Sequence, residues 1–240
     1  MKAKNAALPL LITVILSALG IAYAGWVDQV YIMGTAEMGS MTLAFDYTEP
    51  PVVSEFHKIG GEGGLVPGEY LGKEVASERA WYDVLVTDCK TGLMGYKELH
   101  IEVNNSYPCL YVYTTFVLRN LGTVPLMVYQ YNITAECISS QTGAKVCDLG
   151  LVPQAAPSGK YEWLLFEDLD GDGEKDADEN FVLWMQTVDG LPLQIDKEGY
   201  QKREIDIHFL QPARQCHIYK FRVSVDAIQW NKLYETVQIT

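Results

Sequence analysis

The chain has 240 residues, with 31 Asp or Glu against 18 Lys or Arg, and its net charge at pH 7 is −13. This balance excludes nucleic-acid binding, which needs a basic face, and suits calcium, cationic partners and solubility outside the cell. The length accommodates one large β domain or two small domains.

The N-terminus has the pattern of a secretory signal peptide. Two lysines precede an apolar run over residues 6–21, and Ala22-Tyr23-Ala24 fits the small-x-small cleavage rule. We therefore predict that residues 1–24 are removed, and the loss of the two lysines takes the net charge to −15. The alternative is a retained membrane anchor, for which the run is short compared with a span of about 20 apolar residues. The prediction is a secreted or cell-surface protein that meets a membrane only during export.

The mature sequence reads mostly as β-strands. Residues 109–119 are almost all β-branched, aromatic or leucine, and a turn at 120–125 leads into a returning strand at 126–134. In residues 218–229 one face carries Tyr219, Phe221, Val223 and Val225, in period-two alternation with Lys220 and Arg222. Further strands are expected at 27–33, 41–47, 97–103, 161–166, 181–187 and 204–210, with 60–68 as a loop and 78–86 ambiguous between helix and strand. Short strands at regular spacing predict an all-β fold, a jelly-roll or Ig-like β-sandwich, in a single domain over residues 37–240.

Five cysteines in an exported chain predict disulfides. Cys137 and Cys147 bracket a short polar turn and are candidates for clipping a hairpin. Cys89 and Cys109 are the next candidate pair, which leaves Cys216 over, although the sequence does not determine the connectivity. Two N-x-S/T sequons suit a glycoprotein, and the candidate glycosylation sites are Asn104 and Asn132.

Residues 168–179, DLDGDGEKDADE, match the calcium-loop pattern D-x-D-x-D-G-x5-E in full. Ca²⁺ takes six to eight oxygen ligands, and this spacing folds them round one point, with Gly173 in the sharp turn. The alternatives are a solvated acidic turn and a site for Mg²⁺ or another hard cation. The flanks read as strands, whereas a sensor needs two helices, so a structural Ca²⁺ is expected. The expected ligands are Asp168, Asp170, Asp172, the carbonyl of Glu174, Asp176 and both oxygens of Glu179.

Catalytic motifs are absent from the sequence. The four histidines form no HExxH pair, no G-x-S-x-G is present, and the Gly-rich stretch at 60–68 lacks the lysine and the strand-loop-helix setting of a phosphate site. The chain is therefore predicted not to be an enzyme.

Two segments resemble a known family. IEVNNSYPCLYVYTTFVLRNLGTVPLMV (101–128) is similar to a strand, a Tyr-Pro-x-x-Tyr start and a strand ending in Asn-x-Gly-Thr-x-Pro, and HFLQPARQCHIYKFRVSVDAIQWN (208–231) to a closing His-x-x-Gln-x-Ala turn, aromatic strand and Gln-Trp-Asn. With a Trp-x-Asp strand directly after the cleavage site, the chain resembles the archaeal bundling pilins, which are akin to the TasA biofilm fibre proteins and camelysin. It departs from that pattern at Cys109, where a glycine is usual, and in the calcium loop, which reads as an insertion.

The resemblance implies an extracellular pilus or biofilm fibre built by donor-strand complementation, in which the N-terminal strand of one subunit fills a groove in the next. The partners would be further copies in a head-to-tail homopolymer, and neighbouring filaments in bundles. The donor would be residues 25–36, and its groove-filling side chains would be Trp26, Val27, Val30 and Ile32.

Two alternatives come from other classes of protein. A secreted, cell-surface β-sandwich could act as a binding or adhesin domain through its acidic face, since the aromatic strand at 218–229 would look the same in any such domain. Camelysin is described as a metallopeptidase, so a secreted metallopeptidase is the third reading, although the sequence shows no zinc motif.

Overall fold

A computed structural model describes residues 38–58, 65–67, 76–154, 160–188 and 190–232 of the chain. The predicted signal peptide at 1–24 and the candidate donor strand at 25–36, with Trp26, Val27, Val30 and Ile32, lie outside the described residues. The description below concerns the compact unit that begins at Gly39.

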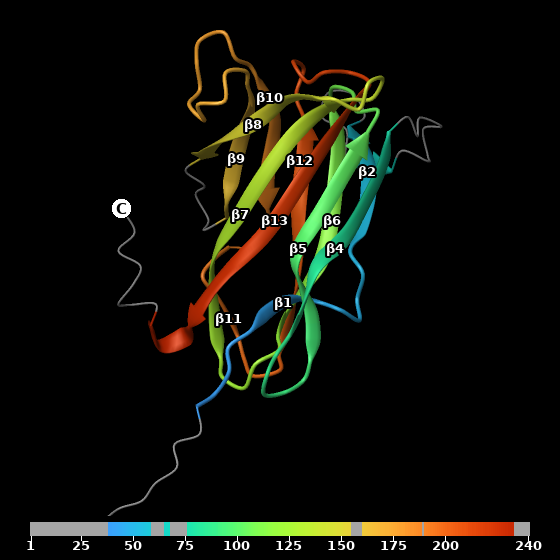
Figure 1. Cartoon of the computed structure of the whole chain (residues 1–240). Coiled ribbons are helices and arrows are strands. Elements are labelled where there is room, and N and C mark those ends of the chain that lie inside the picture. The colour runs from blue at the N-terminus through green and yellow to red at the C-terminus, as the bar shows by residue number, and fades with distance from the viewer. Residues whose placement is uncertain (1–37, 59–64, 68–75, 155–159, 189, 233–240) are drawn as a thin grey trace, which may run out of the picture. The chain divides into compact units, whose positions relative to one another are not determined.

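The described residues are almost entirely β-strands and turns, with one 3-10 turn at Trp230–Lys232 and no α-helix, so the all-β prediction is confirmed (Figure 1). The strands are β1 (Leu43–Asp46), β2 (Val52–Lys58), β3 (Leu65–Pro67), β4 (Ser77–Thr87), β5 (Met94–Asn104), β6 (Leu110–Asn120), β7 (Leu126–Ser139), β8 (Lys145–Gln154), β9 (Glu162–Asp168), β10 (Phe181–Thr187), β11 (Leu193–Ile195), β12 (Tyr200–Phe209) and β13 (His217–Gln229). The ambiguous segment at 78–86 is strand β4, and the stretch predicted as a loop at 60–68 contains the short strand β3.

Nine antiparallel strands close into a barrel, whereas two separate sheets of a sandwich were expected. The order is β1-β5-β13-β7-β8-β9-β10-β12-β6, and β6 pairs with β1 again to complete the ring. Antiparallel neighbours point in opposite directions, and this alternation cannot continue all the way round a closed ring with an odd number of strands. One strand of the nine therefore has to lie across its two neighbours. That member is β1, which pairs through only a few residues with the start of β5 and the end of β6.

The core follows the period-two pattern of the sequence. Tyr219, Phe221 and Val223 of β13 are 0–1% exposed, as their predicted shared face requires. Inward residues of the other long strands complete the core, and they include Leu99, Ile101, Val112, Phe116, Leu165, Leu183, Ile205, Ile207 and Phe209. Close packing fixes even small groups, since a Cβ at Gly150 would lie 2.0 Å from the Phe166 ring.

Candidate functional site

The acidic loop connects β9 to β10 at one end of the barrel (Figure 1). Its first and last carboxylates are anchored in the fold: Asp168 is the final residue of β9 and 8% exposed, and Glu179 is 5% exposed. Gly171 and Gly173 have φ values of 83° and 78°, a left-handed backbone that favours glycine. The pattern predicted the turn at Gly173, and the structure adds a second one at Gly171.

Backbone N–H groups of the loop point inward at its carboxylates. Asp168 accepts bonds from Gly171 N at 2.7 Å and Gly173 N at 3.1 Å. Glu179 accepts from the N–H groups of both arms of the loop, Leu169 N at 2.7 Å and Asp176 N at 3.1 Å. These bonds wrap the chain round its own acidic side chains.

Three predicted ligands come together in this arrangement. Asp168, Asp170 and Asp172 each offer an oxygen, and these oxygens lie within 4.8 Å of one another. Glu179 lies outside this trio and Asp176 is exposed at the loop surface. Desolvation, followed by the charges of Asp172, Asp170 and Glu179, raises the pKa of Asp176. The donor set is made of hard oxygens with concentrated negative charge, which fits Ca²⁺.

Cys137 and Cys147 are brought together as the hairpin prediction requires. They are direct partners across the β7–β8 ladder, and both are buried. A hydrogen bond between the two thiols lowers the pKa of Cys137 and raises that of Cys147. The side chains are free thiols here, but directly opposed antiparallel residues have the Cα separation that a disulfide needs.

The second predicted pair is not brought together. Cys89 lies in the β4–β5 turn and Cys109 in the β5–β6 connection, so the full length of β5 separates them. Eleven residues of strand span about 36 Å, and a disulfide needs Cα atoms within about 7 Å. The pairing of Cys89 with Cys109 inside one chain is therefore wrong for this fold.

The two sequons differ in their surroundings. Asn104 ends β5, and its sequon hydroxyl, Ser106 Oγ, is buried and donates to the carbonyls of Arg214 and His217. Asn132 lies in the middle of β7, and its amide Nδ2 donates to Asp226 at 2.8 Å on the outer surface. Glycosylation of either stays a prediction.

One side of strand β4 has no strand partner among the described residues. β4 pairs with β5 only, and it lies beside β2 without ladder bonds to it. On β6 the pairing with β2 ends at Thr115 and that with β1 begins at Leu118. In this gap the N–H of Val117 donates to Tyr82 Oη of β4 at 3.4 Å. We call this junction of β4 with β2 and β6 the seam.

Apolar side chains gather along the seam. Tyr82 stacks on Phe45 with ring centroids 5.3 Å apart, and its pKa is raised to about 12, chiefly by burial. Beside it Val84 and Leu85 of β4 are 49% and 56% exposed. A strand edge left unpaired beside exposed apolar residues is a template for pairing with another strand.

The chain joins the barrel through a hydrogen-bonded clamp, formed by Ser40, Thr42, Asp88 and Thr123. Asp88 accepts bonds from Ser40 Oγ at 2.9 Å and Thr42 Oγ1 at 2.7 Å. Ser40 N donates to Thr123 Oγ1, and Thr123 N donates back to the Ser40 carbonyl, both at 2.9 Å. Although burial alone would raise the pKa of Asp88, the bonds from Thr91, Thr42, Lys90 and Ser40 hold it well below its usual value.

The clamp is closely packed as well as hydrogen-bonded. A Cβ at Gly39 would lie 2.4 Å from Val124 Cγ1, and one at Gly122 would lie 2.4 Å from the Ser40 carbonyl oxygen. Asn120, fully buried, holds the adjoining turn by donating to the Val124 carbonyl at 2.8 Å and accepting from Gly122 N at 3.0 Å. The path of the chain is therefore fixed from Gly39 onward.

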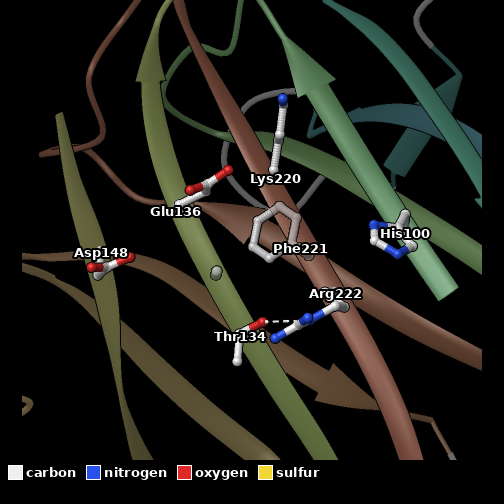
Figure 2. Close-up of a pocket in the computed structure, with 8 residues that line it drawn as sticks. His100, Thr134, Glu136, Asp148, Lys220, Phe221 and Arg222 are labelled. Atoms are coloured by element: carbon white, nitrogen blue, oxygen red, sulfur yellow. Dashed lines mark hydrogen bonds between the residues drawn. The ribbon is translucent and has the colours of Figure 1, made fainter. Parts of the chain in front are cut away.

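A groove of about 460 Å³ lies on the outer face of β5, β13, β7 and β8, and Figure 2 shows the side chains that line it. Its charges are largely matched within the protein: Lys220 lies 3.8 Å from Glu102, and Arg222 lies 3.8 Å from Glu98 and donates to Thr134 at 3.3 Å. Exposed pairs of this kind contribute about 0–1 kcal/mol each. Glu136, which also lines the groove, has no ion-pair partner among the described residues.

A buried carboxyl group lies on another outer face. Asp206 of β12 is 5% exposed; Gln186 Nε2 donates to its Oδ2 at 2.6 Å, and its Oδ1 has no hydrogen-bond partner among the residues that the structure describes. The pKa of Asp206 is raised to about 6. Burial is the main cause, and the charge of Glu204 on the same strand adds to it. No sequence pattern indicates this group, because Asp206 occupies an outward-facing strand position, which is normally exposed to solvent.

Comparison with known proteins adds no family assignment: no protein-family model matches the chain, and no curated protein is similar to it. The resemblance to fibre proteins therefore rests on the quoted segments alone. In the part of the chain that the structure describes, no helix is long and apolar enough to cross a membrane.

Proposed function

We propose that this chain is a subunit of an extracellular filament that assembles by donor-strand complementation, with residues 25–36 of one copy added to the seam of the next. The observation that carries the proposal is the second edge of β4, which pairs with no strand among the described residues. An unpaired strand edge is a template for another strand, and strand addition gives backbone hydrogen bonds along its whole length.

The dimensions of the seam suit the proposed donor. β4 has 11 residues, close to the 12 of the donor segment. An added strand would pack beside the exposed side chains of Val84 and Leu85, and full burial of an aliphatic side chain contributes at most about 1.5–3 kcal/mol. Trp26, Val27, Val30 and Ile32 supply apolar surface of matching chemistry.

Strand direction favours a neighbouring copy over the chain's own seam. The donor ends three residues before Gly39, which the clamp fixes at the end of the barrel where β4 finishes. Folded back on its own barrel, the donor would run parallel to β4, and parallel pairs are slightly less stable per residue. A donor from a neighbouring copy is free to pair antiparallel, and a head-to-tail contact that does not close produces a filament.

Two changes test this function on the mature protein. Deleting residues 25–33 should leave a folded monomer that forms no filaments in electron micrographs. Leu85→Lys should have the same effect at the acceptor edge, because it places a charge where the donor has to pack. Val146→Lys is the matched control, since Val146 is also an exposed strand residue, 38% exposed, on β8 away from the seam. Filaments from the deleted protein or from Leu85→Lys would overturn the proposal.

We also propose that residues 168–179 hold one structural Ca²⁺, with Asp168, Asp170, Asp172, Glu174, Asp176 and Glu179 as the ligand set. The inward N–H groups and the anchored Asp168 and Glu179 support this role. The strands on either side have no two helices to open, so the ion would hold the loop in one shape rather than act as a switch.

A cell-surface binding domain is the second candidate, and the groove in Figure 2 is the observation that favours it. Dispersed monomers under filament-forming conditions would support it over the fibre. A metallopeptidase would need a zinc site, and the one cluster of three or more metal-binding side chains found in the described residues is the aspartate trio. Zinc analysis with a casein assay tests this third reading.

A further inference from the structure

Three exposed thiols lie at the two ends of the barrel. Cys89 is in the β4–β5 turn, while Cys109 and Cys216 are in the connections at the far end, after β5 and before β13. None of the three forms a disulfide within the described chain. An odd number of cysteines in an exported protein points to pairing between molecules.

Cys89 belongs to the end of the barrel that holds the clamp. The residue before it is Asp88, which binds Ser40 and Thr42 and so ties the β4–β5 turn to the point where the chain enters the barrel. In a head-to-tail filament the donor segment connects this end of one copy to the seam of the next. The link between donor and barrel is only two residues long, residues 37 and 38, so the Cys89 end has to lie against the neighbouring copy.

If the donor strand pairs antiparallel to β4, its direction determines which end of the neighbouring barrel contacts the donor's own barrel. β4 runs from the Cys109 end towards the Cys89 end, because it precedes the turn that carries Cys89. A donor antiparallel to it finishes, at residue 36, beside the Cys109 end. The clamp of one copy then abuts the end of the neighbour that carries Cys109.

We propose that Cys89 of one copy and Cys109 of the next form a disulfide that makes the filament covalent. This inference rests on the proposed function. The disulfide between Cys89 and Cys109, which the length of β5 prevents within one chain, would thus form between two copies.

Cys109 suits this role better than Cys216. It directly precedes β6, whose first residues pair with β2 at the seam. Gln211 Nε2 donates to Cys109 Sγ at 3.2 Å. Cys216 precedes β13; its N–H donates to the Ser106 carbonyl at 3.2 Å, and its own carbonyl accepts a bond from Ser140 of the β7–β8 turn.

The bond forms by thiol–disulfide exchange with a small-molecule disulfide as the oxidant. The Cys109 thiolate attacks one sulfur of the oxidant and releases one thiolate, which gives a mixed disulfide. The Cys89 thiolate then attacks the Cys109 sulfur and releases the second thiolate. Two protein thiols are oxidised, the oxidant is reduced to two thiols, and the protons of the protein thiols pass to solvent or to those leaving groups.

The test is a non-reducing gel of the mature protein, assembled in oxidised glutathione and boiled in detergent with a thiol-alkylating agent. The parent should give a ladder of multimers that collapses to monomer on reduction. Cys89→Ser and Cys109→Ser should each give monomer only, while Cys216→Ser should keep the ladder. An equal mixture of Cys89→Ser and Cys109→Ser should stop at covalent dimers, since each copy has one of the two thiols.

Electron microscopy of the same samples separates the two proposals. Filaments that yield no ladder, or a ladder lost in Cys216→Ser and kept in Cys109→Ser, would overturn the disulfide and leave the filament intact. A parent that forms no filaments would overturn the proposed function and this inference with it.

Discussion

Asp206→Asn should stabilise the protein at neutral pH and remove part of its pH dependence. The folded-state pKa of Asp206 is about 6, against 3.8 for the free side chain. Two pKa units correspond to about 3 kcal/mol at 1.36 kcal/mol per unit. This is the penalty for keeping the carboxylate ionised in the fold at pH 7.5, and an uncharged amide of the same shape avoids most of it. We expect a gain of about 2 kcal/mol, because burying the amide retains some cost.

The sign of the pH dependence follows from proton binding. Between pH 4 and pH 6 the folded state holds a proton at Asp206 that the unfolded chain has released, so stability falls as the pH rises through this window and levels off above it. The charged and titratable groups around Asp206 are Glu204 on β12, Tyr113 on β6 and Lys160 before β9.

Urea unfolding of parent and variant from pH 4 to pH 8 measures the effect. The difference between the two free energies of unfolding isolates Asp206 from the other carboxyl groups. The free energy of unfolding of the variant should increase relative to that of the parent as the pH rises from 4 to 6. The difference between the two should stay constant from pH 6.5 to pH 8. An equal pH slope in both proteins would refute the assignment of a raised pKa to Asp206.

Three further predictions use the same folded domain. Asp168→Ala with Asp170→Ala should lower the melting temperature only when Ca²⁺ is present, because a ligand of the folded state stabilises by mass action; equal melting of parent and variant in excess Ca²⁺ would count against a bound ion. Asp88→Ala should cost about 1–3 kcal/mol in urea unfolding, because it leaves the half-buried donors Ser40 and Thr42 without a charged acceptor. The loss should shrink as the pH falls below 4, because the parent's carboxylate is then progressively protonated and its own stabilising contribution is lost. Oxidation should join Cys137 to Cys147 and raise stability by about 3 kcal/mol, a gain that Cys147→Ser should lack, and mass spectrometry of the digested protein checks the bond.

The long strands could be predicted from the sequence because each buries one face. Residues 109–119 and 218–229 became β6 and β13, with Tyr219 and Phe221 in the core. β8 was missed because Gly150 and Pro153 interrupt its pattern, and its strand structure comes from pairing on both sides with β7 and β9. Closure of the ring through β1 could not be predicted, since it depends on four residues that contact two distant strands.

The site was predictable only where its residues are close in sequence. The loop spacing identified the aspartate trio, and the hairpin identified Cys137 with Cys147. The clamp and the seam join residues far apart along the chain, and no local pattern marks Asp88 or Tyr82. At Cys109 the local backbone explains a departure seen in the sequence. Its φ of 68° lies in the left-handed region, which favours glycine, so cysteine carries a conformational cost of about 1–2 kcal/mol there.

The clamp also determines how the barrel would bear tension. A pull on the chain at Gly39 passes first to the bonds of Ser40 and Thr42 with the 121–124 turn and with Asp88, and then along β1. The ladder bonds of β1 to β5 and β6 run across the strand, so a force along the chain loads both sets together in shear instead of opening them one by one. The shortest strand of the ring, held on both edges, is thus where the fold would resist mechanical extraction of its N-terminal segment.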